Sequence, residues 1–207
     1  DEVVTITASD VALSADSQVC GLAEGDQIQM SELFHALLVY SANDAAMAIA
    51  RTVGDGSVDT FVQMMNETAQ SLGMTGTHFV NPHGLHNDDH YTTVYDLYLI
   101  FQKAIQDETF YQLISTSSYT TNYTGADGSA KTQDWSSTNQ YKTGESKLPD
   151  GFTLVGGKTG TTGEAGFCLV LLTDNTGGQP VISIVLKADC KSNLYLMMNE
   201  ILAGCGN

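Results

Sequence analysis

The sequence predicts an α+β fold, in which a helical lobe packs on an antiparallel sheet with a C-terminal helix. Helical hydrophobic periods fill most of the first 114 residues, whereas the last third holds three apolar runs separated by short turns. The chain has 207 residues, 42% of them hydrophobic, which is enough to bury one sizeable core. We therefore expect a single domain, with a helical lobe at about residues 1–114 and a loop and sheet lobe at about 115–207.

The helical lobe is predicted from hydrophobic periodicity. Behind the capping residue Ser31, the stretch SELFHALLVY places its apolar residues on one face of a short buried helix. After a break at residues 41–44, the small-residue stretch AAMAIARTVG predicts a second helix. Ser57 opens a third helix that Gly73 ends, and helical periods return at about 93–105 and 107–115. The spacing places these side chains in the core: Phe61, Met64, Met65, Leu72, Tyr95, Leu97 and Leu99.

The second lobe begins with a change of composition. Between residues 115 and 149 the sequence is rich in Ser, Thr, Asn, Gly and Tyr, which indicates short exposed strands and loops. The runs at 151–162, 165–175 and 179–189 are typical of consecutive antiparallel strands. Residues 190–204 have the period of a helix packed on this sheet. Because such a helix separates Cys190 from Cys205 by about 20 Å, we expect no disulfide between them.

The charge balance excludes one class of partner. The 24 acidic and eight basic residues give a formal net charge of -16, which repels phosphate backbones, so we expect no nucleic-acid partner. No apolar stretch is as long as a membrane-spanning helix, and the first residues lack the pattern of a signal peptide. The four cysteines are too few and too scattered for a disulfide scaffold or a C-x-x-C metal site. We therefore expect a soluble chain.

Two short motifs carry possible chemistry. Lys158 lies between glycines in GGKTGTT, at the start of an apolar strand, although the chain has few basic residues. Ser41 and Asn43, at a break between buried helices, can point into one cleft and offer a proton relay and an amide. Lys158 would supply a positive charge facing that cleft, and Gly160 would let a substrate backbone approach the strand. Each motif alone also fits an ordinary helix cap or a solvated strand lysine.

Together, Ser41-Ala42-Asn43 and Lys158-Thr159-Gly160 resemble the second and third motifs of the penicillin-recognising serine enzymes. The similarity is greatest to the low-molecular-mass D-alanyl-D-alanine carboxypeptidases of the β-lactamase and penicillin-binding-protein superfamily. The resemblance implies that superfamily's fold and a serine-type peptidase of peptidoglycan metabolism that uses no cofactor. It covers nearly the whole chain, through DEVVTITASDVAL, LLVYSANDAAMAIA, FVQMMNETAQSLGMTGTHFVNPHGL, HYTTVYDL, TNQY and GGKTGTTGEAGFCLV.

The resemblance also implies a role for each motif residue. Ser41 would relay a proton to the leaving amine, Asn43 would hold the substrate's amide, and Lys158 would support the electric field around Ser41. The following strand residues would bind the substrate, the threonines through its terminal carboxylate: Thr159, Gly160 and Thr161. The implied partners are stem peptides ending in D-Ala-D-Ala and, for the intact parent protein, β-lactams. The implied location is extracellular or in the cell envelope.

One departure from the family pattern concerns the nucleophile. The family's attacking serine lies in an S-x-x-K motif upstream of the S-x-N serine, but this sequence has no Lys or Arg before Arg51. No serine ahead of Ser41 can therefore have the lysine base. We expect the N-terminal strands and the nucleophile helix of the fold to be missing from this chain, and the chain to be inactive alone. Self-association or a bound upstream fragment would then fill the space that they leave.

Three alternatives remain open at this stage. The chain could be a non-catalytic peptidoglycan-binding homologue, or a β-lactamase, since that class shares the two motifs. It could also be a metal-binding module, because the segment HGLHNDDH gathers three histidines and two aspartates. The spacing of this segment matches no known ligand template, so the favoured site contains no metal. The histidines of that alternative are His83, His86 and His90.

Overall fold

The computed structural model describes residues 2–205, which form two compact units that interleave along the chain. Unit 1 contains the chain up to Thr68 together with Phe79–His90 and Ser117–Ser137. Unit 2 contains Ala69–His78, Tyr91–Thr116 and the chain from Thr138 onward. The helices and antiparallel sheets confirm the expected α+β class. The division at about residue 114, which separates helical from strand-rich sequence, stays a prediction.

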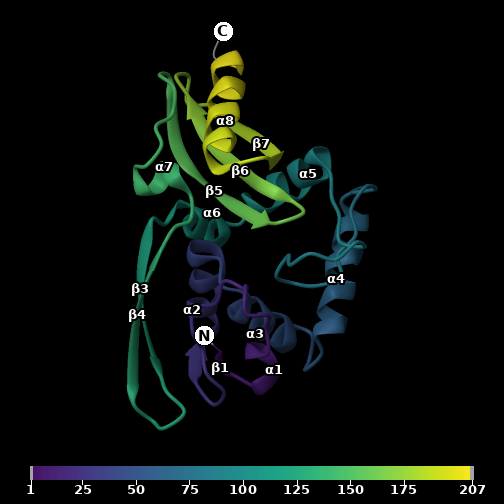
Figure 1. Cartoon of the computed structure of the whole chain (residues 1–207), viewed down its shortest axis with the longest axis vertical. Coiled ribbons are helices and arrows are strands. Elements are labelled where there is room, and N and C mark those ends of the chain that lie inside the picture. Colours follow the sequence, from purple (N-terminus) through teal and green to yellow (C-terminus); the bar gives the residue numbers. More distant parts are fainter. Residues whose placement is uncertain (1, 206–207) are drawn as a thin grey trace. The chain divides into compact units, whose positions relative to one another are not determined.

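Unit 1 contains a four-stranded antiparallel sheet in the order β1-β2-β3-β4. Its longest pairing is the β3–β4 hairpin, which is extended in Figure 1 and pairs in register from Ser118↔Ser136 to Thr124↔Ala130. The short strand β2 joins the hairpin through Gln27↔Thr124. The sequence predicted exposed strands in this region but not their pairing with the N-terminal segment. The strands are β1 (Val3–Thr5), β2 (Gln27–Gln29), β3 (Ser118–Thr124) and β4 (Ala130–Ser136).

The helices of unit 1 follow the predicted order, with one irregularity. The expected cap Ser31 is wrong: Ser31 lies inside the helix, which begins at Met30 after the N-cap residue Gln29. The helix changes into a turn of π-helix before Ser41. The apolar face of this helix packs with small residues of the next helix and with Tyr123 and Trp135 of the hairpin. Its buried members include Leu33, Ala36, Ala45 and Ala48. The helices are α1 (Ala8–Val11), α2 (Met30–His35), η1 (Ala36–Tyr40), α3 (Asn43–Val53) and α4 (Val58–Ser71).

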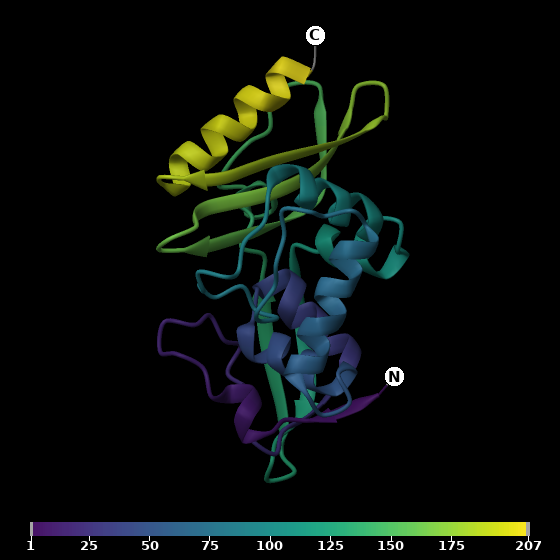
Figure 2. The same cartoon turned by 90° about the vertical axis from the view of Figure 1, so that its right-hand side faces the viewer.

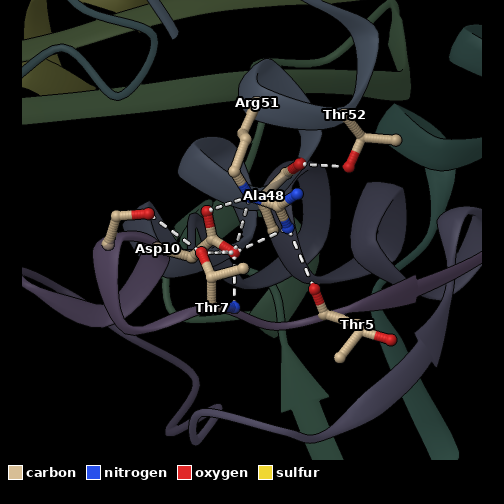
Figure 3. A network of polar contacts seen from close by, with 7 residues as sticks. Thr5, Thr7, Asp10, Ala48, Arg51 and Thr52 are labelled. Carbon is tan, nitrogen blue, oxygen red and sulfur yellow. Dashed lines mark hydrogen bonds and ion pairs between the residues drawn. The ribbon is translucent and has the colours of Figure 1, made fainter. Parts of the chain in front are cut away.

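A polar network fixes α1 against α3 inside unit 1 (Figure 3). The guanidinium of Arg51 on α3 reaches the buried carboxylate of Asp10 on α1. The same carboxylate accepts the backbone N–H of Thr7 at 2.8 Å, and Arg51 also donates to the carbonyl oxygen of Thr5 at 3.0 Å. A buried charge needs such partners, because leaving water without them is costly.

Unit 2 contains a three-stranded antiparallel sheet in the order β5-β6-β7, as the three apolar runs predicted. Side chains alternate between its faces. Leu169, Leu171 and Val185 pack with the C-terminal helix α8, whereas Val170 and Leu172 pack with α5 and α6. Figures 1 and 2 show α8 along one face of this sheet. The elements are α5 (Val94–Ala104), α6 (Glu108–Ser115), α7 (Gln140–Thr143), β5 (Phe152–Thr162), β6 (Gly166–Asn175), β7 (Pro180–Ala188) and α8 (Lys191–Cys205).

Two expectations about the core are wrong. Tyr95 is 67% exposed and Met64 is 41% exposed, although both share a helical spacing with apolar neighbours. Periodicity predicts which residues share a face but not how wide the buried stripe is, and residues at its margin remain in water.

Two expectations from the sequence concern disulfides and membrane-spanning helices. All four cysteines are free thiols, and α8 separates Cys190 from Cys205 as expected. Within residues 2–205, no helix combines the length and the apolar composition that crossing a membrane requires.

Candidate active site

The Ser41-Ala42-Asn43 motif forms a tight turn between η1 and α3. Ser41 has left-handed backbone angles, with φ 70° and ψ 42°. Its N–H and that of Ala42 both donate to the carbonyl oxygen of Ala36, and this closes the π-helical turn. Left-handed angles in a residue other than glycine cost about 1 to 3 kcal/mol and persist only where the surroundings hold them. Such strained residues occur preferentially at functional sites.

Asn43 begins α3 and is largely buried, with 9% of its surface exposed. Its backbone N–H donates to the carbonyl oxygen of Gln18 at 2.8 Å, so the helix start is tied to the segment that precedes β2. Ser41 and Asn43 are thus held within one turn of unit 1 by backbone contacts on both sides.

The Lys158-Thr159-Gly160 motif lies within β5, which is an edge strand of the sheet in unit 2. Lys158 pairs with Val170 and Thr159 pairs with Leu169. Directly paired residues project to the same face, so Lys158 shares the face of α5 and α6, whereas Thr159 shares the face of α8. The motif therefore presents its charge on one face and a hydroxyl on the other.

Burial lowers the pKa of Lys158 to about 8. The cause is desolvation, which penalises the charged ammonium and so favours the neutral amine. The ammonium donates to the carbonyl oxygen of Thr159 at 2.8 Å. An amine with a pKa close to neutral pH can carry a charge in one step and hold or release a proton in another.

A second lysine joins β5 to the C-terminal end of α6. The ammonium of Lys142 donates to the carbonyl oxygens of Ser115 and, at 3.4 Å, of Val155. Burial lowers its pKa to about 8 as well. The next strand residue, Gly156, has no room for a side chain, because a Cβ there would lie 2.3 Å from the carbonyl oxygen of Ile114. These contacts fix the start of the strand that carries Lys158.

Gly160 differs from Gly156 in its surroundings. It is exposed, and in unit 2 no atom lies within 4 Å of the position that a Cβ would occupy. Packing inside the unit therefore does not require glycine here, so the open space is available to a bound molecule. The Thr159 hydroxyl lies 2.5 Å from the hydroxyl of Thr138. Thr138 belongs to the TNQY stretch, but its contact with Thr159 was not predicted from the sequence.

The predicted site residues therefore fall into two local groups. Ser41 and Asn43 share the turn in unit 1. Lys158 and the three residues predicted to bind substrate, Thr159, Gly160 and Thr161, are consecutive on β5 in unit 2. The assembly of the two groups into one site, with the Ser41 Oγ beside the Lys158 Nζ, stays a prediction. Sequence reasoning missed Asp44, a buried residue whose carboxylate accepts the backbone N–H groups of Cys20, Gly21 and Leu22. In the sequence it is an ordinary acidic residue at a helix start.

The histidine-rich segment does not form a metal centre in the described part of the chain. Among residues 2–205 there is no group of three His, Cys, Asp or Glu side chains placed to hold a metal ion. The Nδ1 atoms of His83 and His90 instead accept the backbone N–H groups of Leu85 and Val80, each at 3.1 Å. Burial and the neighbouring His90 lower the pKa of His83. The metal-binding alternative therefore has no geometric support.

Comparison with known proteins identifies relatives along nearly the whole chain. The family model of D-alanyl-D-alanine carboxypeptidases, peptidase family S11, matches residues 1–190. The D-alanyl-D-alanine carboxypeptidase of Streptomyces sp. (strain K15) is 34% identical over 196 residues, which cover 91% of this chain and 65% of the relative. The D-alanyl-D-alanine carboxypeptidase DacD of Escherichia coli (strain K12) is 30% identical over 194 residues, 91% of this chain and 46% of the relative.

The solved structures agree with this assignment. The crystal structure of the Streptomyces K15 DD-transpeptidase matches with a TM-score of 0.87 and 31% identity, covering 100% of this chain and 79% of that one. This confirms the penicillin-binding-protein type of fold that the motifs implied. The chain spans only 46% to 65% of the length of the two curated relatives.

Proposed function

Since the chain belongs to the D-alanyl-D-alanine carboxypeptidase family, we propose that it forms part of a serine-type D-Ala-D-Ala carboxypeptidase. The substrate is a peptidoglycan stem peptide, and the product is the same peptide without its terminal D-alanine. The observation that carries this proposal is the arrangement on β5, where Lys158, Thr159, Gly160 and Thr161 follow one another on an edge strand. Lys158 is desolvated, and no atom lies within 4 Å of the position that a Cβ of Gly160 would occupy.

Strand β5 is suited to bind an extended peptide. An edge strand offers unpaired backbone N–H and C=O groups, to which a peptide can add as a further strand. The hydroxyls of Thr159 and Thr161 can donate to a terminal carboxylate, which a D-Ala-D-Ala peptide always carries. In a chain with a net charge of -16, the ammonium of Lys158 supplies the local positive charge that such an anion requires.

The proposed reaction is acyl transfer in two steps. A serine oxygen attacks the carbonyl carbon between the two D-alanines, the C–N bond breaks, and Ser41 relays a proton to the departing amine of D-alanine. Water then attacks the serine ester, releases the shortened peptide as a carboxylic acid, and returns the proton to the serine. Asn43 holds the amide of the penultimate residue, and the backbone N–H of Thr161 is one donor to the oxyanion.

The attacking serine needs a base, and the printed sequence offers none in the family's arrangement. None of its serines is followed three positions later by a lysine. The proposal therefore assigns the nucleophile and its lysine to residues other than these 207. It also assigns the protein to the cell envelope or the exterior, where peptidoglycan lies, and makes β-lactams inhibitors that acylate the same serine.

The test is D-alanine release by the complete gene product that contains these residues. An N-acylated peptide ending in D-Ala-D-Ala should lose one equivalent of D-alanine, and the matched L-Ala-L-Ala peptide should stay intact. Saturable binding of the D-Ala-D-Ala peptide without D-alanine release would contradict the proposal and favour a non-catalytic peptidoglycan-binding homologue. Rapid hydrolysis of penicillin without action on the peptide would favour a β-lactamase.

A further inference from the structure

The carboxylate of Asp44 lies directly after the Ser41-Ala42-Asn43 turn and is 1% exposed. It accepts the backbone N–H groups of three successive residues of the segment before β2. The Cys20 N–H reaches one carboxylate oxygen at 3.1 Å, and the N–H groups of Gly21 and Leu22 reach the other, each at 3.1 Å. The Cys20 thiol also donates at 3.4 Å. Its pKa is raised by burial and by the charge of Asp44, so the thiol remains protonated and can donate.

Three successive N–H groups that converge on one anion form a concave anion-binding site in the backbone. Such a curve needs left-handed backbone angles, and Gly21 supplies them with φ 81°. The carboxylate of Asp44, a side chain of the same protein, thus occupies this anion-binding site. It lies at the N-terminal end of α3, where it also accepts the N–H of Ala45 at 3.0 Å and where the helix dipole favours negative charge.

The segment before β2 also contacts the Ser41-Ala42-Asn43 turn through Gln18. The carbonyl oxygen of Gln18 accepts the N–H of Asn43 at 2.8 Å, and the side-chain amide of Gln18 donates to the carbonyl oxygen of Tyr40. Residues 18–22 therefore bind the chain both immediately before and immediately after Ser41. This is the kind of support that a left-handed residue other than glycine requires.

We propose that Asp44 is a positioning residue, which binds the 18–22 segment to α3 and thereby fixes Ser41 and Asn43 in the geometry that acyl transfer needs. The inference rests on the proposed function for the role of these two residues. The contacts of Asp44 with the 18–22 segment do not depend on the proposed function. The contacts and the activity are therefore tested separately.

The first test compares Asp44→Asn with a matched variant, Asp26→Asn. Asp26 is also a buried aspartate of unit 1 that accepts two backbone N–H groups, from Ala23 at 3.0 Å and Ala126 at 3.1 Å. It binds the β3–β4 hairpin rather than the turn. Both variants replace a carboxylate by an amide of the same shape. Asp26→Asn also removes the ion pair with Lys131, so the control covers a general loss of stability in unit 1.

Hydrogen exchange of the complete gene product provides the first readout. In Asp44→Asn, the exchange rate of the Ala42 and Asn43 amides, divided by that of β6 amides, should rise roughly 10- to 100-fold, because the 18–22 segment, which supplies the acceptor of the Asn43 N–H and supports the turn, is held less firmly. In Asp26→Asn, that ratio should stay within about threefold of the unmodified protein. Equal changes of the ratio in the two variants would overturn the positioning role and leave Asp44 a general stabiliser.

Kinetics with the D-Ala-D-Ala peptide provide the second readout. Asp44→Asn should lower kcat about tenfold or more while KM changes less, since a displaced proton relay slows the chemical step. Asp26→Asn should leave kcat within about threefold. Faster exchange at the turn with an unchanged kcat would also overturn the positioning role. If the unmodified protein releases no D-alanine, the proposed function fails, but the exchange comparison still decides whether Asp44 holds the turn.

A milder variant keeps the test valid if Asp44→Asn does not fold. The side chain of Gln18 is exposed, so Gln18→Ala removes only its bond to the Tyr40 carbonyl oxygen. The amides of Ala42 and Asn43 should again exchange faster, by a smaller factor of about three to ten. Unchanged exchange at both amides would show that the 18–22 segment does not hold the turn.

Discussion

Arg51 and Asp10 form a two-pronged ion pair in unit 1, with the Nε of Arg51 2.9 Å from Oδ1 and the Nη2 2.8 Å from Oδ2 of Asp10. The Asp10 side chain is 1% exposed and that of Arg51 21%. Replacement Arg51→Met leaves the carboxylate buried without its cation, which should lower the free energy of unfolding by roughly 2 to 3 kcal/mol. Urea unfolding followed by circular dichroism measures this loss.

The control for this prediction is Arg51→Lys. Lysine keeps the charge but not the planar fork, so we expect a smaller loss of about 1 kcal/mol. An Arg51→Met variant as stable as the unmodified chain would show that the pair does not stabilise unit 1.

The pair of Asp26 and Lys131 should make stability depend on pH in the acid range. Burial opposes ionisation of Asp26, but hydrogen bonds from Lys131, Ala23 and Ala126 outweigh it and keep the Asp26 pKa below its ordinary value. The resulting stabilisation is complete above the unfolded pKa, at about 4, and is lost as the pH falls through the lower folded value. The difference in unfolding free energy between the unmodified chain and Asp26→Asn should therefore shrink from pH 6 to pH 2. A constant difference would contradict the assignment.

Lys158 should also make stability rise with pH, but in the alkaline range. Its pKa is about 8 in the folded chain, against about 10.4 when unfolded. Between these values the unfolded chain binds more protons than the folded one, so stability rises with pH in this window. Compared with Lys158→Met, the unmodified chain should gain stability from pH 8 to pH 10. Lys142 is present in both chains, so its contribution cancels. No relative gain would mean that the Lys158 ammonium is not desolvated.

The 207-residue chain alone should form no stable adduct with penicillin. A serine hydroxyl is a weak nucleophile without an adjacent base. None of the serines in this chain is followed three positions later by a lysine. Intact-mass measurement after incubation with benzylpenicillin should show the unmodified mass. A stoichiometric adduct mapped to a serine of this sequence would show that the nucleophile has been misassigned.

Much of the fold could be predicted because its long elements have clear periods. The strands around Leu169 and Val185 and the helix before Cys205 were predicted within a few residues, since each has an unbroken apolar pattern. The short elements β1, α1 and β2 were not predicted. Three or four residues carry too little periodicity, and tertiary contacts such as that of Asp10 with Arg51 decide their structure.

The residues of the candidate site also differ in whether the sequence could predict them. Ser41, Asn43 and Lys158 were found because they belong to motifs that a single sequence can display. Asp44 and Thr138 were not recognised as supporting residues, because their partners, Cys20 to Leu22 and Thr159, are about 20 residues away in the sequence. No local pattern encodes such contacts, which arise only when the chain has folded.

The most direct test of the central claim is a double-mutant cycle on the complete gene product, with Ser41→Ala, Lys158→Ala and the two combined. If both residues serve one proton relay, each single variant should lower kcat/KM for the D-Ala-D-Ala peptide by about 100-fold or more. The double variant should then be hardly slower than the slower single variant, because residues that act as one unit are not additive. A double variant whose loss equals the product of the two single losses would contradict a shared site, as would full activity in either single variant.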